Sequence, residues 1–223
     1  MNPRQRALEI HRRLLDEYGK PVWREKLPPI DELVSTILSQ NTNDDNRDVA
    51  FERLKETFPT WEEVMGAQTE DVIEAIRPAG LANQKGPRIQ NVLRQIEDER
   101  GNLDLTFLQD MPVGEARDWL LKFKGVGPKT AAIVLLFALD MPDFPVDTHI
   151  YRLSGRLGLR PEKMSADKAH QQLAELFPSE DYYDAHLNLI RHGRQVCHAR
   201  NPECDRCCLT DLCPFYEDIV QPS

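Results

Sequence analysis

A short glycine motif, Gly125-Val126-Gly127, constrains the fold of this chain more than any other feature. It is followed by Pro128 and separates two stretches of helical periodicity, so the backbone must bend tightly between two helices. The fixed φ of proline suits the first position of a helix, where its missing N–H is no loss. We therefore predict a helix-hairpin-helix with helices over 112–123 and 128–139.

The surroundings of this turn are basic. Three lysines and no acidic residue lie between Trp119 and Leu139, although the whole chain has a net charge of -9. Free amides of Gly125, Val126 and Gly127 near a helix N-terminus would form an anion site. We interpret the turn as a phosphate cradle; a plain connection between two helices is the alternative.

Lys129 opens the second helix beside this cradle and is a candidate amine nucleophile. A lysine with a pKa of ~10.4 is neutral in about one molecule in a thousand near pH 7.4. The helix N-terminus and the nearby Lys122 or Lys124 would lower that pKa, and desolvation in a closed complex would lower it further. Lys129 therefore lies where an amine can be made reactive.

Asp147 follows an apolar run of helix length and a loop that can return the chain toward Lys129. This arrangement predicts a carboxylate facing the amine. Aspartate is also a favoured N-cap, so Asp147 could simply start a helix over 148–157. The two roles are compatible.

All five cysteines lie in the last 27 residues of the chain, and four of them have a 6-2-5 spacing: Cys197, Cys204, Cys207 and Cys213. Clustered thiolates in a reducing compartment favour a metal over disulfides. Four thiolates suit tetrahedral zinc or an iron–sulfur cluster, and the uneven spacing favours [4Fe–4S] because zinc ribbons usually pair two short-spaced knuckles. An unligated or disulfide-bonded set is the remaining alternative, and Cys208 is spare.

The segment around the first cysteine is rich in arginine. Four arginines, including Arg194 and Arg200, lie between Ala185 and Cys208, against only Glu203 and Asp205. A metal that pins a basic loop predicts a second phosphate contact, whereas a solvated surface loop would have the same composition.

The remaining periodicity is helical, with about ten helices and no sustained alternation of period two, so we predict an all-α fold. A helix over 87–100 is expected to start at Pro87. No run approaches the ~18 apolar residues that a membrane span needs. The polar N-terminal residues lack a signal-peptide core, so we expect a cytoplasmic protein without a membrane partner.

Three motifs coincide in this order: Gly125–Ala131 of the hairpin, the run Val146-Asp147-Thr148-His149, and the 6-2-5 cysteine spacing. Together they resemble the endonuclease III family of DNA glycosylase/AP lyases over about residues 30–213. The resemblance also includes the segments Leu38–Asp44, Gly80-Leu81 and His192-Gly193-Arg194.

The resemblance implies roles for individual residues. Lys129 is then similar to the lysine that attacks C1′ of the damaged nucleotide, Asp147 to the aspartate that assists it, and the four cysteines to the [4Fe–4S] ligands. The damaged base is flipped out of the duplex. Leu81 resembles the side chain that is wedged into the base stack, and Gln40 or Asn41 the polar residue that fills the vacated space.

The implied activity is that of a bifunctional DNA glycosylase/AP lyase of base excision repair. Such an enzyme would remove oxidised pyrimidines from double-stranded DNA and nick abasic sites by β-elimination through a lysine Schiff base. We expect a monomer, associated with the nucleoid if the source is a prokaryote. The alternatives are a monofunctional mismatch or damaged-base glycosylase, and a non-catalytic DNA-binding module with a structural metal.

The resemblance also predicts two helical lobes with a cleft between them. A six-helix barrel-type lobe over 27–141 would carry the hairpin, and residues 1–26 with 142–223 would form the iron–sulfur lobe. One departure concerns the hairpin, where Phe123-Lys124 replaces the usual Leu-Pro. The turn loses a φ constraint and gains the charge of Lys124, so DNA affinity or its salt dependence should differ.

Overall fold

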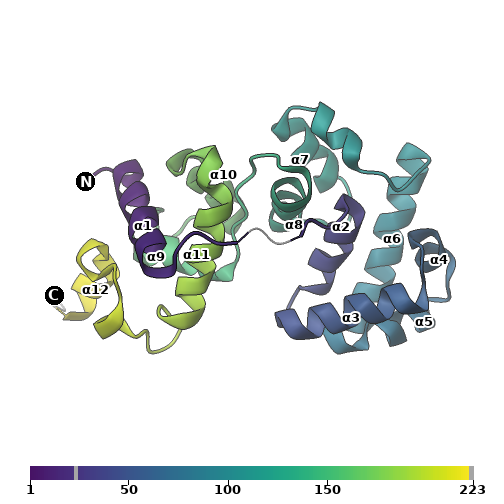
Figure 1. Cartoon of the computed structure of the whole chain (residues 1–223), viewed down its shortest axis with the longest axis horizontal. Coiled ribbons are helices and arrows are strands. Elements are labelled where there is room, and N and C mark those ends of the chain that lie inside the picture. Colours follow the sequence, from purple (N-terminus) through teal and green to yellow (C-terminus); the bar gives the residue numbers. More distant parts are fainter. Residues whose placement is uncertain (23–24, 221–223) are drawn as a thin grey trace. The chain divides into compact units, whose positions relative to one another are not determined.

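The computed structural model describes residues 1–22 and 25–220, and every regular element in these residues is helical (Figure 1). The chain forms two compact units. Met1–Glu25 with Pro142–Ser223 is unit 1, and Lys26–Met141 is unit 2. The predicted all-α fold is confirmed. None of the described helices is long and apolar enough to cross a membrane.

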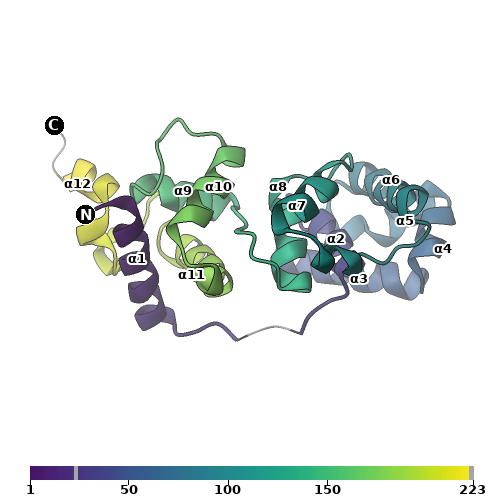
Figure 2. The same cartoon turned by 90° about the horizontal axis from the view of Figure 1, so that it is seen from above.

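The first helix of unit 2 is α2, which lies at the centre of its packing. The helices of this unit are α2 (Pro29–Leu38), α3 (Asp44–Thr57), α4 (Trp61–Gly66), α5 (Thr69–Ala75), η1 (Arg77–Ala79), α6 (Ala82–Arg100), η2 (Thr106–Asp110), α7 (Val113–Leu121), α8 (Pro128–Ile133) and the π-helical turn η3 (Val134–Ala138). α2 packs against α3, α6, α8 and η3, and Leu33 and Ile37 are fully buried (Figure 2). The hairpin helices α7 and α8 are therefore supported by the main core.

Aromatic side chains pack against one another around the first helix of the hairpin. Trp119 of α7 makes edge-to-face contacts with Phe123 and Phe107, with ring centroids 4.7 and 5.0 Å apart. Phe123 is buried, so this replacement of the usual leucine keeps an apolar anchor in the core.

Unit 1 is assembled from two distant parts of the chain. It contains α1 (Pro3–Tyr18), α9 (Thr148–Arg156), α10 (Ala166–Leu176), η4 (Ser179–Asp181), α11 (Tyr182–Gln195), η5 (Cys204–Arg206), η6 (Thr210–Leu212) and α12 (Pro214–Val220). α1 packs on α10 and α11 through Ala7, Ile10 and Leu14 on its buried face. A Cβ on Gly193 of α11 would lie 2.9 Å from the Cβ of His149, so glycine allows α9 to approach closely.

Two helices differ from their predicted form. α6 begins at Ala82 rather than Pro87, because a proline after the first turn removes only one helical hydrogen bond and the first turn is anchored through Lys85. The predicted helix over 128–139 changes to π-helical geometry at Val134, and the Met141 amide donates to the Leu135 carbonyl at 2.9 Å. Such π turns frequently accompany functional sites.

Candidate functional site

The turn between α7 and α8 requires glycine for two reasons. Gly125 has a φ of +110°, and a Cβ there would lie 2.6 Å from both Cγ and Cδ of Arg88. The Val126 amide is not free, since it donates to the Phe123 carbonyl at 3.0 Å and closes the turn. This corrects the expectation of three free amides. Within the described turn and loop hydrogen bonds, the amides of Gly125 and Gly127 donate to no backbone acceptor.

The three lysines of the hairpin have different surroundings. Lys122 pairs with Glu99, at 3.3 Å between Nζ and Oε1, and the same carboxylate accepts a hydrogen bond from Trp119. Lys124 is exposed and Lys129 is half-buried in the first turn of α8. Neither has an ion pair or side-chain hydrogen bond to the residues that the structure describes, so both amines are available to an anion or an electrophile.

Two strained loops carry the residues expected to enter the DNA stack. Leu81 has a φ of +49°, follows Gly80 at +66°, and is 46% exposed. Asn41 has a φ of +53° and is also exposed, one residue after the half-buried Gln40. A leucine in the left-handed region is rare and strained, and such strain concentrates at functional sites.

Two side chains of α6 hold these loops, and sequence reasoning missed both. Lys85 is only 1% exposed; its Nζ donates to the carbonyls of Leu38 and Ala79 at 2.7 and 2.8 Å. Burial, and next the charge of Arg88, lower the pKa of Lys85 to about 8. Arg88 Nη1 donates to Gln40 Oε1 at 2.5 Å. Unit 2 thus gathers the Gln40 loop, the Leu81 loop and the hairpin turn around the start of α6.

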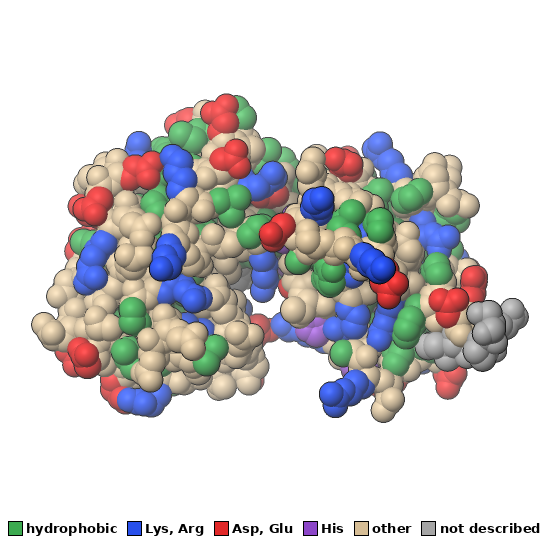
Figure 3. Space-filling model, turned by 180° about the vertical axis from the view of Figure 1, so that it is seen from behind, with side chains coloured by type: hydrophobic (Ala, Val, Ile, Leu, Met, Phe, Trp, Pro, Cys, Tyr) green, Lys and Arg blue, Asp and Glu red, His purple; other side chains and the backbone are tan. Residues whose placement is uncertain are grey.

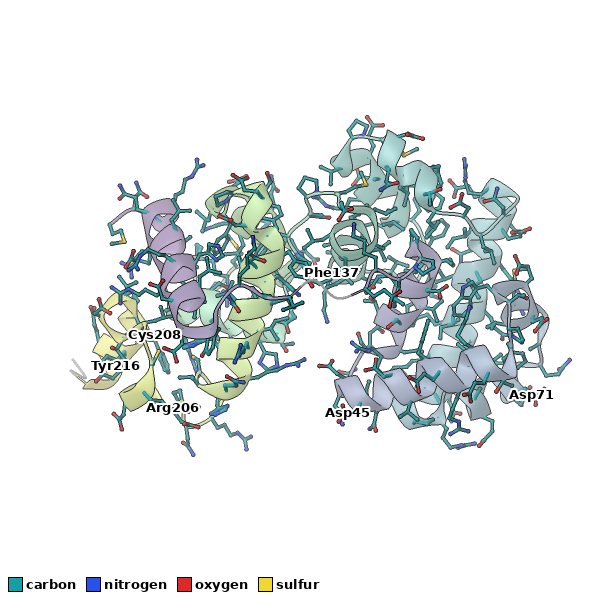
Figure 4. All side chains as sticks on the ribbon, viewed as in Figure 1. Asp45, Asp71, Phe137, Arg206, Cys208 and Tyr216 are labelled. Atoms are coloured by element: carbon teal, nitrogen blue, oxygen red, sulfur yellow. The ribbon has the colours of Figure 1, made fainter. Side chains whose placement is uncertain are left out.

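Acidic residues of unit 2 occur both near this cluster and away from it: Glu99 pairs with the hairpin Lys122, and Asp44 begins the helix after the Gln40 loop. Asp71 on α5 is exposed and occupies the end of the unit that is remote from α8 (Figure 4). On the face shown in Figure 3, lysines and arginines of each unit are mixed with acidic side chains. A polyanion would therefore meet a surface of mixed charge on this face rather than a uniformly basic one.

Asp147 is the N-cap of α9 in unit 1, as predicted for one of its two roles. Its Oδ1 accepts a hydrogen bond from the Ile150 amide at 2.7 Å, and the residue is half-buried. The cap orients the carboxylate and leaves Oδ2 without a hydrogen bond among the described residues. Lys129 belongs to unit 2, so the approach of Asp147 to this amine stays a prediction.

Four cysteines of unit 1 line one cavity that is partly open to solvent. They are Cys197, Cys204, Cys207 and Cys213, and the wall also includes the apolar side chains of Leu153, Val196 and Phe215. Cys208 does not line it; its carbonyl instead accepts a hydrogen bond from Arg13 of α1 at 3.1 Å (Figure 4).

The sulfur atoms around this cavity are surrounded by N–H donors. Arg156 Nη1 donates to Cys197 Sγ at 3.1 Å, and the Leu209 amide donates to Cys207 Sγ at 3.4 Å. Burial raises the pKa of Cys204, Cys207 and Cys213, that of Cys207 to about 12, so the free thiols are protonated near neutral pH. In the described residues, no three His, Cys, Asp or Glu side chains lie close enough to hold a single metal ion.

Arginines of α9, which the sequence did not single out, position the cysteine loop. Arg152 donates to the Gly193 and Cys197 carbonyls at 2.8 and 2.9 Å, and Arg156 donates to the carbonyls of His198 and Ala199. The helix that begins at Asp147 therefore also fixes the loop after α11.

The four arginines of the C-terminal segment divide into two groups. Arg206 pairs with Glu203 and donates to the Gln195 carbonyl, and Arg191 lies over the ring of Tyr18. Arg194 and Arg200 are exposed, as the other two are. A phosphate contact of Arg194 and Arg200 stays a prediction.

Comparison with known proteins identifies this arrangement. Residues 34–179 match the HhH-GPD superfamily of base excision DNA repair proteins, and the chain belongs to that superfamily. Within it, the chain belongs to the endonuclease III family. It is 38% identical over 191 residues to endonuclease III of Sulfolobus acidocaldarius, with 85% of this chain and 83% of the relative covered.

Two further similarities agree with this placement. A putative DNA glycosylase of Arabidopsis thaliana is 39% identical over 199 residues, covering 86% of this chain and 67% of the relative. A trapped covalent endonuclease III–DNA intermediate matches with a TM-score of 0.85 at 26% identity, over 99% of this chain and 100% of that one. The predicted family and enzyme class are confirmed.

Proposed function

We propose that this protein is a bifunctional DNA glycosylase/AP lyase that removes oxidised pyrimidines from duplex DNA and then cleaves the strand at the abasic site. The observation that supports this most is Lys129, a half-buried amine in the first turn of α8, next to the glycine turn, with no ion pair or side-chain hydrogen bond to the described residues. The structure with 26% identity that contains a trapped covalent protein–DNA intermediate supports a covalent bond between the protein and DNA.

In the proposed reaction, the neutral Lys129 amine attacks C1′ of the damaged nucleotide, the C1′–N bond breaks, and the base leaves with its electron pair and takes up the proton that Nζ loses. The nitrogen lone pair then opens the sugar ring, O4′ takes a proton from water, and an iminium forms between Nζ and C1′. The iminium acidifies the 2′ proton; its removal expels the 3′ phosphate by β-elimination. Hydrolysis then releases the sugar fragment and restores the amine.

Asp147 is proposed to stabilise the positive charge that develops on the sugar as the base departs. Its hydrogen bond to the Ile150 amide supports this role, because the cap holds the carboxylate in one orientation before substrate binds. Preorganised charge of this kind needs no rearrangement at the moment of reaction.

DNA would be held by main-chain and side-chain groups of both units. The Gly125 and Gly127 amides with Lys124 are proposed to bind backbone phosphate, and Arg194 and Arg200 to add a second contact. Leu81 is proposed to enter the base stack, and Gln40 or Asn41 to occupy the space left by the flipped nucleotide. Such a substrate would place the protein in the compartment that holds the chromosome, which in a prokaryote is the nucleoid.

The four cavity-lining cysteines fit a [4Fe–4S] cluster better than zinc. A zinc ion would need every sulfur within about 2.3 Å of one centre, and the described thiols do not converge on a single ion. The donors from Arg156 and Leu209 suit charged sulfur. When bound by Cys197, Cys204, Cys207 and Cys213, the cluster would fix the loop that carries Arg200. Iron and sulfide analysis of protein purified without oxygen tests this proposal.

The catalytic proposal is tested by borohydride trapping on a duplex with one oxidised pyrimidine. The wild-type protein should form a covalent complex and a nicked strand, and Lys129→Gln should form neither. A trapped complex with Lys129→Gln would contradict the assignment. Lys122→Gln is the matched control, because Lys122 lies in the same hairpin but pairs with Glu99.

The same assay distinguishes the alternatives. A monofunctional glycosylase would release the base and leave an intact abasic strand. A non-catalytic binding module would bind the lesion without base release, and Asp147→Asn would then change nothing.

A further inference from the structure

The start of α6 contacts three segments that are proposed to bind DNA: the Gln40 loop, the Leu81 loop and the hairpin turn. Lys85 and Arg88 are three positions apart and thus on one face of the helix. Lys85 donates to the carbonyls of Leu38 and Ala79, which lie two residues before Gln40 and Leu81. Arg88 contacts Gln40 itself and the hairpin turn at Gly125.

Lys85 is an unusual core residue. Its ammonium is almost completely buried and makes no ion pair with a described carboxylate; its recorded partners are two main-chain carbonyls. Burying a charge in this way is unfavourable, and a leucine or methionine would fill the same volume without that penalty. The presence of an amine here is therefore not explained by core packing alone.

The two carbonyls that accept hydrogen bonds from Lys85 indicate its structural role. Leu38 is the last residue of α2 and Ala79 is the last residue of η1, so both carbonyls lie at helix ends without a helical partner. One amine thus joins the two helix ends from which the Gln40–Asn41 loop and the Gly80-Leu81 loop depart.

Arg88 extends this connection to the hairpin. Its guanidinium orients the Gln40 side chain, while its aliphatic stem fills the space where Gly125 has no Cβ. A Cβ at position 125 would lie only 2.6 Å from this stem, so the absence of a side chain at Gly125 lets Arg88 pack directly against the hairpin turn.

We propose that Lys85 and Arg88 are positioning residues that lock the Gln40 loop, the Leu81 loop and the hairpin turn into one arrangement, so that all three engage a damaged nucleotide together. This inference rests on the proposed function, since it concerns how that enzyme distinguishes damaged from intact duplex. Preorganised loops lose less conformational entropy on binding, which raises the affinity. The increase applies only to DNA into which the Leu81 side chain can insert. Phosphate binding by surface charge is unaffected.

The test compares Lys85→Met with wild type for binding to a duplex with a tetrahydrofuran abasic analogue and to the same undamaged duplex. Affinity for the analogue should fall at least about tenfold, with less than about twofold change for undamaged DNA. The signal of 2-aminopurine placed opposite the analogue should fall in parallel. Arg94→Met is the matched control, because Arg94 is on the same helix but donates to the Met65 carbonyl instead.

A double-mutant cycle gives an independent readout that decides the matter if Lys85→Met does not fold. Arg88→Met and Gln40→Ala should each weaken analogue binding, and the double variant should lose no more than Arg88→Met alone. Additive losses, or unchanged discrimination in a folded Lys85→Met protein, would overturn the positioning role. Wild-type protein that cannot cleave an abasic duplex would instead refute the proposed function.

Discussion

In unit 2, the loops that carry Gln40 and Leu81 are held by the buried Lys85 and the half-buried Arg88 of α6. In unit 1, the loop over 197–213 instead surrounds a cavity lined by its own cysteines. The first set of loops is fixed by the protein fold itself. The second contacts α9 through Arg152 and Arg156 and surrounds a pocket that is partly open to solvent. The difference predicts that the unit 2 loops keep their arrangement without a cofactor, while the 197–213 loop becomes more ordered when the proposed cluster is bound.

The largest expected effect follows from removing a cavity cysteine. Cys204→Ala should prevent cluster assembly and increase amide exchange across 197–213 by more than about 100-fold, because that loop loses its central cross-link. Exchange at 38–43 and 79–82 should stay as in wild type. Hydrogen-exchange mass spectrometry measures both regions in one sample. Cys208→Ala is the control, and equal effects of the two variants would contradict the ligand set.

The next effect separates charge from capping at Asp147. Asp147→Asn keeps an N-cap of similar quality and should leave the melting temperature nearly unchanged, but slow base release about 10²–10³-fold. Asp147→Ala should slow it similarly and also destabilise unit 1 by about 1 kcal/mol. Single-turnover kinetics and thermal melts measure the two quantities. A full rate with Asp147→Asn would leave the residue with its capping role alone.

A pH effect on stability should come from unit 2 through Lys85. Burial lowers its pKa to about 8 in the folded chain, against the ordinary lysine value of 10.5. Between these values the unfolded chain binds more protons, so the free energy of unfolding rises with pH, by about 3 kcal/mol in the limit. Below pH 8 both states are protonated and the contribution is constant. Urea unfolding of wild type and Lys85→Met between about pH 7.5 and 10 measures this effect. If the free energy of unfolding changed with pH in the same way for both proteins, the assignment to Lys85 would be contradicted.

The smallest effect compares phosphate contacts of the two units. Lys124→Ala and Arg200→Ala should each reduce the slope of log K against log salt by about 0.9, the value for one phosphate contact. Lys122→Ala should change it less, because Lys122 already pairs with Glu99. Fluorescence anisotropy on undamaged duplex at several salt concentrations measures the slopes. A slope unchanged by Lys124→Ala would exclude the extra hairpin charge from DNA binding.

Local sequence rules predicted the elements that depend on local chemistry. Helix starts at Pro128 and Thr148 follow from proline preference and capping, and the structure confirms them, including the Asp147 cap. The glycine turn was predicted in the same way, because few other residues reach the φ of Gly125.

The features that escaped prediction depend on tertiary contacts. Lysine is almost never fully buried, so a sequence pattern treats Lys85 as a solvated residue. The role of Arg88 depends on Gln40 and Gly125, which are distant in sequence and adjacent in space. The internal hydrogen bond of the Val126 amide likewise requires the actual turn geometry.

The assembly of unit 1 from both α1 and residues after Pro142 has a consequence for biosynthesis. Unit 2 is contiguous and can fold while the rest of the chain is still being made. α1 emerges first, yet its partners α10 and α11 follow only on the order of ten seconds later at ordinary translation rates. During that interval the apolar face of Ala7, Ile10 and Leu14 lacks its native partners, and exposed apolar surface of this kind favours aggregation.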